Sequence, residues 1–203
     1  MVVGGGIVGC MTALELVGRA FQVTIVERNI IAAQTSGEAS WAGAGILFPL
    51  LPWFYKDEVN ALSLAGAARY PQVCAQLLAE TGIDPEYTQS GMLIAPPFDA
   101  ALAQSWCAKN GVEFQQKGDD LFLPNVAQVK PPHLLQAFKQ NLIQRGVNLI
   151  EQTQLEPLQV CENIDGWRTN TGAALRADAF VVTSGAWSLR VSPGGSTQWC
   201  SGE

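Results

Sequence analysis

The sequence predicts an α/β fold built on a βαβ unit, and the first 27 residues carry the evidence for it. Residues 1–3 are typical of the end of a strand, and residues 7–19 place apolar side chains on one face of a helix. The β-branched run at residues 22–27 is typical of a buried strand. Because parallel strands joined by a helix almost always cross over with one hand, we expect a right-handed βαβ unit here.

A glycine motif lies between the first predicted strand and the first predicted helix. Gly4, Gly6 and Gly9 have the spacing GxGxxG. In this context Gly4 permits the tight turn, Gly6 lets backbone approach a pyrophosphate, and Gly9 lets the helix pack closely on the strand. The free amides at the start of the helix then face the phosphates. The motif predicts dinucleotide binding, and a purely structural glycine turn is the alternative.

An acidic residue ends the second predicted strand. Glu27 lies about 20 residues beyond the glycine motif, where a carboxylate accepts hydrogen bonds from ribose hydroxyls. A negative charge at this position also disfavours a 2′-phosphate. Neither Glu27 nor the glycines distinguish FAD from NAD, so these residues alone fit both a flavoenzyme and an NAD-dependent dehydrogenase.

The remaining elements follow from periodicity and turn residues. The predicted helices cover residues 57–80 with a bend near Pro71, residues 100–109, and a stretch from Pro131 that ends at Gly146. The predicted strands cover residues 87–95, a pair within 114–129 joined through Gly118, Asp119 and Asp120, residues 147–151, a meander over 155–161, 167–170 and 174–176, and residues 179–183. The apolar stretch 46–55 is too short to cross a bilayer and contains two prolines, so we expect a packed loop.

The amino-acid composition excludes some classes of binding partner and indicates the cellular compartment. Of 203 residues, 48% are hydrophobic and 15% are charged, which is enough apolar material to bury a core. With 12 Lys and Arg against 18 Asp and Glu, the net charge of −6 disfavours nucleic acid and anionic membranes as partners. Five scattered cysteines without a CxxC pair, and no secretory pattern, predict a cytoplasmic location. A single histidine, His133, gives no expectation of a metal site.

Several segments together resemble a known family. They are GGGIVG at residues 4–9, VER at 26–28, SWAGAGILFPLLPW at 40–53, VAQVKPPHLL at 126–135 and VVTSGAWS at 181–188. The sequence resembles the D-amino-acid oxidase superfamily of FAD-dependent oxidoreductases, and within it the glycine oxidases of thiamine biosynthesis. The tryptophan-containing loop is the specific part of this resemblance, whereas the glycine motif is common to many families.

The resemblance implies a fold and a set of FAD-binding residues. The implied fold is a glutathione-reductase-like FAD-binding βαβ domain with an incomplete antiparallel-sheet substrate lobe. The implied contacts are Ile7 and Val8 at the pyrophosphate, Glu27 and Arg28 at the adenosine ribose, Ala39 and Ser40 along the phosphates, Ala44, Gly45 and Ile46 along the flavin ring, Leu155 at the adenine, and Gly185, beside Trp187, in a second glycine turn. Leu155 as an ordinary core leucine, and residues 183–188 as an ordinary strand-to-helix turn, are the structural alternatives.

The resemblance also implies an activity and a domain arrangement. The activity is oxidation of glycine or a similar small amino acid or amine by FAD and oxygen, which gives the imine, then glyoxylate and ammonia, with hydrogen peroxide. No catalytic side chain is identified in this sequence. The expected domains are residues 1–84 and 126–190 for FAD, 85–125 for the incomplete substrate lobe, and 191–203 as an irregular tail.

The family continues beyond the point that matches Ser188, with strands and an arginine that hold the substrate. We therefore expect this sequence to need a second half, which a second chain could carry. A non-catalytic FAD-binding fragment, or one chain of a split enzyme, is the alternative to an active oxidase.

Overall fold

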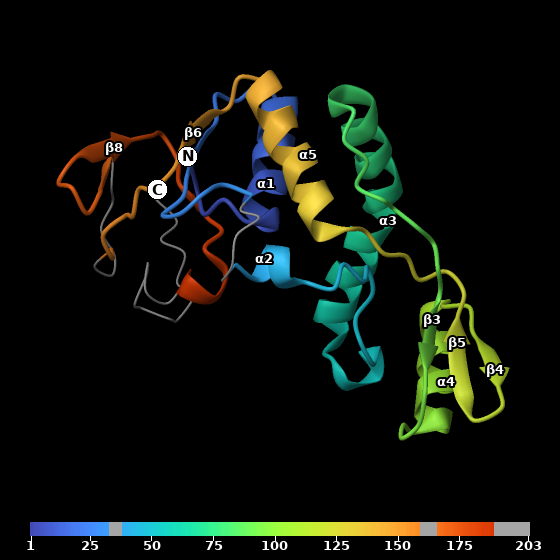
Figure 1. The fold of residues 1–203 in the computed structure, drawn as a ribbon. Coiled ribbons are helices and arrows are strands. Elements are labelled where there is room, and N and C mark those ends of the chain that lie inside the picture. The colour runs from blue at the N-terminus through green and yellow to red at the C-terminus, as the bar shows by residue number, and fades with distance from the viewer. Residues whose placement is uncertain (33–37, 159–165, 189–203) are drawn as a thin grey trace. The chain divides into compact units, whose positions relative to one another are not determined.

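The structure is a computed structural model that describes residues 1–32, 38–158 and 166–188. The chain divides into two units, one of residues 1–42 and 138–203 and one of residues 43–137. The first unit contains β1 (Val2–Val3), α1 (Ile7–Gly18), β2 (Thr24–Val26), α2 (Ala39–Ala42), β6 (Asn148–Ile150), β7 (Gly166–Arg168), β8 (Ala174–Arg176), β9 (Val181–Val182) and η2 (Gly185–Trp187) (Figure 1). The second contains η1 (Pro52–Phe54), α3 (Asp57–Thr81), β3 (Met92–Ile94), α4 (Ala100–Asn110), β4 (Gln115–Lys117) and β5 (Asp120–Leu123). Helix α5 (Pro131–Gln144) spans the boundary between the two segments.

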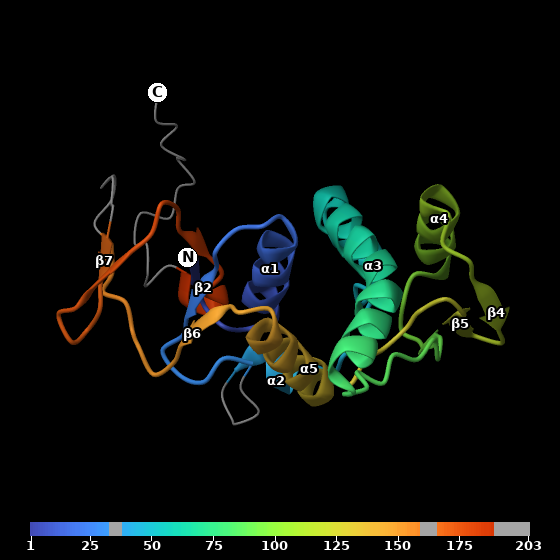
Figure 2. The same cartoon turned by 90° about the horizontal axis from the view of Figure 1, so that it is seen from above.

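The first unit is built on a parallel sheet with the strand order β6-β2-β1-β9. Val2 of β1 pairs with Ile25 of β2 on one side and with Val181 of β9 on the other. Val2 and Ile25 are fully buried, as expected for the central strands of a parallel sheet. Helix α1 connects β1 to β2 and packs beside both strands (Figure 2). The predicted βαβ unit and the α/β fold class are therefore confirmed.

Small residues bring α1 close to this sheet. Gly9, Cys10 and Ala13 form its buried face. Burial raises the pKa of the Cys10 thiol to about 12, so the thiol stays protonated, and it donates a hydrogen bond to the Gly5 carbonyl at 3.6 Å. Cys10 is a packing residue of the helix and not a reactive thiol.

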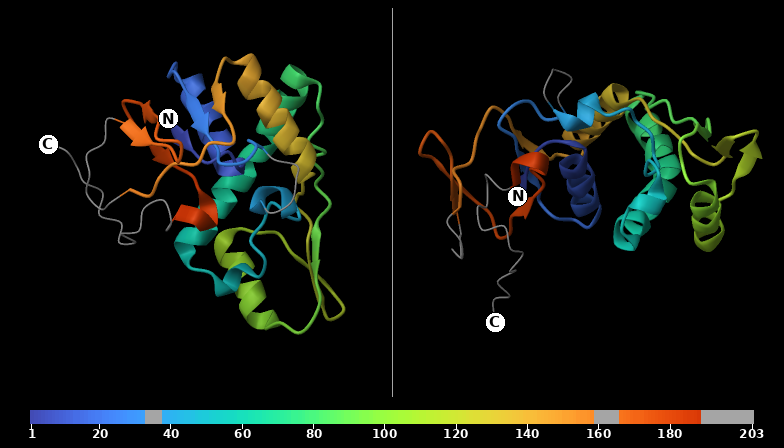
Figure 3. Two further views of the ribbon diagram at one scale, coloured as in Figure 1. Left: turned by 60° about the vertical axis from the view of Figure 1, so that its left-hand side comes forward. Right: turned by 90° about the horizontal axis from the view of Figure 1, so that it is seen from below.

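A smaller core lies where the β7–β8 hairpin meets the parallel sheet. Trp167 is 2% exposed and packs with Val3 and Leu155, and its ring meets Phe180 edge to face at 5.6 Å between centroids. The indole N–H is satisfied because it donates to the Glu156 carbonyl at 2.7 Å. Figure 3 shows the orange hairpin beside the blue strands of the sheet. The hairpin thus packs against β1 and β2 through Trp167.

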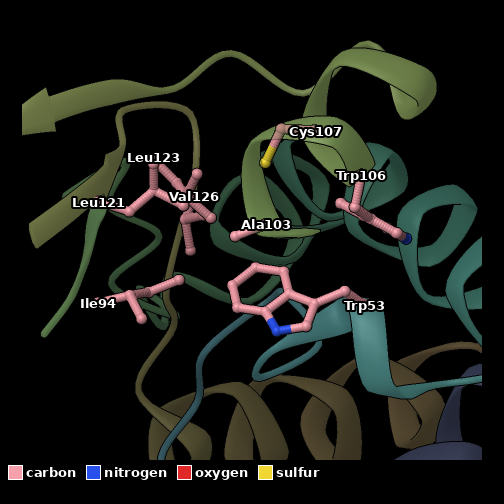
Figure 4. Packing of buried hydrophobic residues seen from close by; sticks show 8 residues of the cluster. All are labelled: Trp53, Ile94, Ala103, Trp106, Cys107, Leu121, Leu123 and Val126. Carbon is pink, nitrogen blue, oxygen red and sulfur yellow. The ribbon is translucent and has the colours of Figure 1, made fainter. Parts of the chain in front are cut away.

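The second unit contains an antiparallel sheet with the order β3-β5-β4. Leu93 of β3 faces Phe122 of β5, and Gln116 of β4 faces Leu121 of β5. The inner face of this sheet packs against α4 and η1 in one apolar cluster (Figure 4). Its buried members are Trp53, Ile94, Ala103, Trp106, Cys107, Leu121, Leu123 and Val126. Its role as a substrate lobe, and the domain boundaries expected above, stay predictions.

Helix α4 carries clear signals at both ends. The Asp99 carboxylate accepts a hydrogen bond from the Leu102 N–H at 2.9 Å, which satisfies one of the free amides of the first turn. Gly111 follows the helix with a φ of +66°, a conformation that glycine adopts without a steric penalty. The predicted helix 100–109 therefore agrees with the structure to within one residue.

Several predicted elements differ in extent. The predicted strand 87–95 is reduced to β3, and Thr88 forms only an isolated bridge with Gln128. The predicted loop 46–55 contains the short helix η1, whose first residue is Pro52. In the predicted meander, β7 and β8 are present, whereas Leu155 forms a single bridge with Thr169, and residues 159–165 lie outside the described residues. In the described part of the chain, no helix combines the length and apolarity needed to cross a membrane.

The core of the second unit generates a stability prediction. Leu121 is fully buried in the cluster, whereas Leu93 on the neighbouring strand is 55% exposed. We expect Leu121→Ala to lower the free energy of unfolding by about 2–5 kcal/mol, because it removes buried methyl groups and leaves a cavity. The matched Leu93→Ala should cost about 0.5 kcal/mol or less. Urea titration of both variants checks this, and equal losses would contradict the assigned core.

Candidate dinucleotide-binding site

The glycine motif turns the chain between β1 and α1 in a space that excludes side chains. Gly4 has a φ of +110°, and a Cβ atom there would lie 2.6 Å from the Thr183 carbonyl oxygen. A Cβ atom on Gly9 would collide with the carbonyl oxygen of Gly4. At Gly6 an added Cβ atom would lie 3.0 Å from the Ser40 hydroxyl. Close backbone packing thus requires glycine at positions 4 and 9, whereas at Gly6 the nearest atom is the side-chain hydroxyl of Ser40.

A cavity of about 610 Å³ opens at the carboxyl ends of the parallel strands, beside this turn. In the part of the chain that the structure describes, its lining comes from the first unit. The lining consists of the ends of β1 and β2, the starts of α1 and α2, Thr153, Gln154, Leu155 and Pro157, and the turn after β9. In open α/β sheets, ligands bind outside the carboxyl ends of the strands. The position of the cavity is therefore that of a nucleotide site.

The start of α1 is built to receive an anion. Gly6 provides no capping side chain, and the first turn of the helix contains no acidic residue. The positive end of the helix dipole therefore faces the cavity with no acidic side chain in the helix's own first turn to offset it. The Ile7 N–H donates to the Ser40 hydroxyl at 3.0 Å, which leaves the hydroxyl hydrogen of Ser40 as a donor for a phosphate oxygen.

Glu27 holds two backbone amides at the end of β2. One carboxylate oxygen accepts the Gly5 N–H at 2.8 Å, and the other accepts the Asn29 N–H at 2.9 Å. Each oxygen has further lone-pair capacity, so the carboxylate can also accept ribose hydroxyls from the cavity that it lines. The predicted ribose acceptor thus has a second task, which is to tie the glycine turn to β2.

Arg28 lies between two other groups of the cavity wall. Its guanidinium stands 4.0 Å from the centroid of the Trp187 ring and 3.8 Å from a carboxylate oxygen of Glu38. The ring face and the carboxylate both attract the cation. These contacts connect β2 to α2 and to η2 across the cavity rim.

The structure brings most of the predicted site residues together. Those that line the cavity are Gly4, Gly6, Ile7, Val8, Glu27, Arg28, Ala39, Ser40, Leu155 and Gly185. Gly9 lies behind the turn, against Gly4. Leu155 is 7% exposed and belongs both to the cavity wall and to the small core around Trp167.

Ala44, Gly45 and Ile46 belong to the second unit and do not line this cavity. Gly45 has a φ of +78°, its carbonyl accepts the Val129 N–H at 2.9 Å, and a Cβ atom there would collide with the Val129 carbonyl oxygen. Ile46 pairs with Gln128 in an isolated bridge. Packing against residues 128–131 thus accounts for this glycine, and the contact of residues 44–46 with a flavin ring stays a prediction.

Sequence reasoning did not assign several lining residues. These are Val3, Val26, Glu38, Thr153, Gln154, Pro157, Thr183, Ser184 and Ala186. Trp187, which the resemblance placed beside Gly185 in the second glycine turn, also lines the cavity. Thr183 contributes most to the turn, since its hydroxyl contacts the carbonyl oxygens of Val3 at 3.0 Å and Gly4 at 2.9 Å. The signal for it was its position as the last residue of the last predicted strand. Thr153, Gln154 and Pro157 carry no local signal, because the sheet register brings them to the site.

Fold and site together define a dinucleotide-binding α/β protein. Comparison with known proteins identifies its family: the chain belongs to the FAD-dependent oxidoreductase family (DAO), whose model matches residues 1–198. FAD is therefore the cofactor of its family, as the resemblance implied. Within residues 1–32, 38–158 and 166–188, no group of three His, Cys, Asp or Glu side chains could hold a metal ion.

Individual relatives agree with this assignment. The glycine oxidase of Pseudomonas aeruginosa is 33% identical over 209 residues, which cover 93% of this chain and 55% of the relative, and that of Pseudomonas putida is 32% identical with the same coverage. The crystal structure of glycine oxidase from Bacillus cereus superposes with a TM-score of 0.79 at 26% identity, over 94% of this chain and 56% of the other. The chain spans about half the length of the curated relatives it matches.

The glycine turn generates a binding prediction. We expect Gly6→Val to abolish retention of FAD, because its side chain would fill the closest approach to the pyrophosphate and press on Ser40. Gly18→Val is the matched control, since an added Cβ atom at Gly18 meets nothing within 4 Å. Flavin absorbance of the purified proteins measures the outcome. Equal flavin content in the Gly6→Val variant and the parent would show that the pyrophosphate lies elsewhere.

Proposed function

We propose that this chain forms the FAD-binding part of an amino-acid oxidase that acts on glycine or a similar small amine. The observation that carries the proposal is the convergence of the glycine turn, Glu27 and Ser40 on one cavity. The family and the names of the glycine oxidase relatives support the oxidase class. They also support FAD over NAD, which disfavours the dehydrogenase alternative.

The residues of the cavity fit the parts of FAD in turn. The start of α1 and the Ser40 hydroxyl would hold the pyrophosphate, and Glu27 would accept the adenosine ribose hydroxyls. Residues 153–155 would lie along the adenine side of the cavity. Bound FAD would supply the redox chemistry, taking the hydride from the substrate carbon and passing electrons to oxygen to give hydrogen peroxide. The side chains described here bind and orient the cofactor.

We propose that the substrate-gripping residues come from sequence that corresponds to the other half of the relatives. The relatives extend well beyond the matched region, and an amino-acid carboxylate needs a positioned cation, for which bidentate arginine is the usual solution. Strand β9 offers a place for such sequence, because Val181 and Val182 are 38% and 42% exposed at the edge of the parallel sheet. Such sequence would belong to the same polypeptide or to a second chain.

The biological setting follows from the same relatives and from the cysteines. A relative from Trichormus variabilis, 27% identical to this chain, is named bifunctional protein ThiO/ThiG. Together with the resemblance to glycine oxidases of thiamine biosynthesis, this supports a role in supplying that route. Cys10, Cys74 and Cys107 are free and buried, which supports a reducing, cytoplasmic compartment.

The ribose contact is tested at Glu27. We expect Glu27→Ala to weaken FAD binding by roughly 1–3 kcal/mol, because the ribose hydroxyls and the Gly5 amide lose a charged acceptor. Glu27→Gln should lose less, because its amide oxygen still accepts one hydrogen bond. Fluorescence titration of FAD measures both affinities. An unchanged affinity in Glu27→Ala would remove Glu27 from the ribose site.

A complementation experiment tests whether this chain binds FAD while other sequence supplies the substrate-binding residues. We expect the 203-residue chain to bind FAD without forming peroxide from glycine, and addition of the second half of a related glycine oxidase to restore some turnover. A peroxidase-coupled assay measures this, with the Gly6→Val variant as the inactive control. Peroxide formation from glycine by the chain alone, lost in Gly6→Val, would show that the substrate residues lie within these 203 residues.

A further inference from the structure

Gly5, which lies between the first two glycines of the motif, packs against Ile31 and Ala32. The Gly5 carbonyl accepts the Ala32 N–H at 2.8 Å, and a Cβ atom on Gly5 would lie 2.7 Å from the Ile31 side chain. Ile31 is fully buried and Ala32 is 4% exposed. Ala32 has a φ of +53°, a left-handed conformation that a non-glycine residue keeps only where neighbouring contacts impose it.

Two charged side chains hold this segment in place. The Ile31 N–H donates to Oε1 of Glu151 at 2.9 Å. The same oxygen accepts Nζ of Lys139 at 2.6 Å, and the two side chains are 32% and 30% exposed. Neither residue lines the cavity. The contacts form a continuous path from α5, through the end of β6, to the glycine turn.

Glu151 repeats on β6 what Glu27 does on β2. Each glutamate directly follows its strand, and the strands are in register, with Val26 opposite Ile150. Both carboxylates accept backbone amides: Glu27 that of Gly5, and Glu151 that of Ile31. Glu27 therefore lines the cavity, whereas Glu151 lies outside it and holds the Ile31 amide next to the glycine turn.

We propose that Lys139 and Glu151 are positioning residues for the dinucleotide-binding turn, acting through Ile31 and Ala32 on Gly5. The proposal rests on the proposed function in that the ligand is FAD. Charge-assisted hydrogen bonds are stronger than neutral ones, so the pair fixes the Ile31 amide more firmly than a neutral acceptor would. Loss of the pair leaves every ligand-contacting residue in the sequence unchanged and loosens the backbone that presents them.

The test combines FAD titration with amide exchange. We expect Glu151→Met to raise the Kd for FAD about tenfold, as for loss of a charge-assisted hydrogen bond that matters to binding. Lys139→Met should raise it less, because Glu151 still accepts the Ile31 amide, and Lys139→Arg should restore it. Lys109→Met is the matched control, since Lys109 pairs with Asp57 at 3.5 Å in the other unit with both side chains largely exposed.

Amide hydrogen exchange without FAD separates positioning from general stability. In Glu151→Met we expect faster exchange at Ala32 and Gly5 and unchanged exchange in the parallel sheet. Equal loss of protection throughout the sheet, or an unchanged Kd despite faster exchange at Ala32, would overturn the proposal. If the parent chain binds no FAD, the proposed function fails. In that case unchanged exchange at Ala32 and Gly5 in Glu151→Met would by itself overturn the positioning role of Lys139 and Glu151. Should Glu151→Met fail to fold, the same readouts apply to Lys139→Met.

Discussion

The close approach of three backbone segments at Gly4 is the constraint on which the rest of the first unit depends. The turn after β1, the start of α1 and the end of β9 meet where no side chain fits, as the positions of Gly4 and Gly9 show. The Thr183 hydroxyl contacts the carbonyl oxygens at the end of β1 and so ties β9 to the turn. Because these contacts join residues about 180 positions apart in sequence, the site forms only when the sheet is complete to β9.

The charges and dipoles around the cavity match a ligand that combines a pyrophosphate with ribose hydroxyls. The start of α1 offers free amides and a positive dipole end, whereas Glu27 at the end of β2 offers acceptors. An anionic pyrophosphate fits the first and neutral ribose hydroxyls fit the second. Arg28 forms an ion pair with Glu38 and a cation–π contact with the Trp187 ring. These two contacts hold three residues of the cavity wall together. The same residues thus provide recognition and shape.

The parts of the site that could be predicted are those encoded locally. GxGxxG, the helix after it and the acid that ends the next strand lie within 27 consecutive residues, and backbone geometry gives each a meaning. Thr153, Gln154 and Pro157 could not be assigned by this route, because the parallel pairing of β2 with β6 carries them to the cavity, and Leu155 was indicated only by the resemblance. Likewise, Glu151 has no local signal beyond ending an apolar strand, and its link to Gly5 through Ile31 exists only in the folded chain.

The sequence by itself determined the fold class and the expected chemistry at the start of α1, because glycine conformation, periodicity and strand-end charge act over a few residues. It indicated the family in a different way, through the resemblance of residues 40–53, 126–135 and 181–188 to known oxidases. Only the tertiary structure decided that Thr183 and Trp187 share a wall with Glu27 and Arg28, and that Gly45 is explained by its packing against Val129. The physical reason is that contacts between distant segments depend on sheet order and register. Those are properties of the whole packed unit and not of any one stretch of chain.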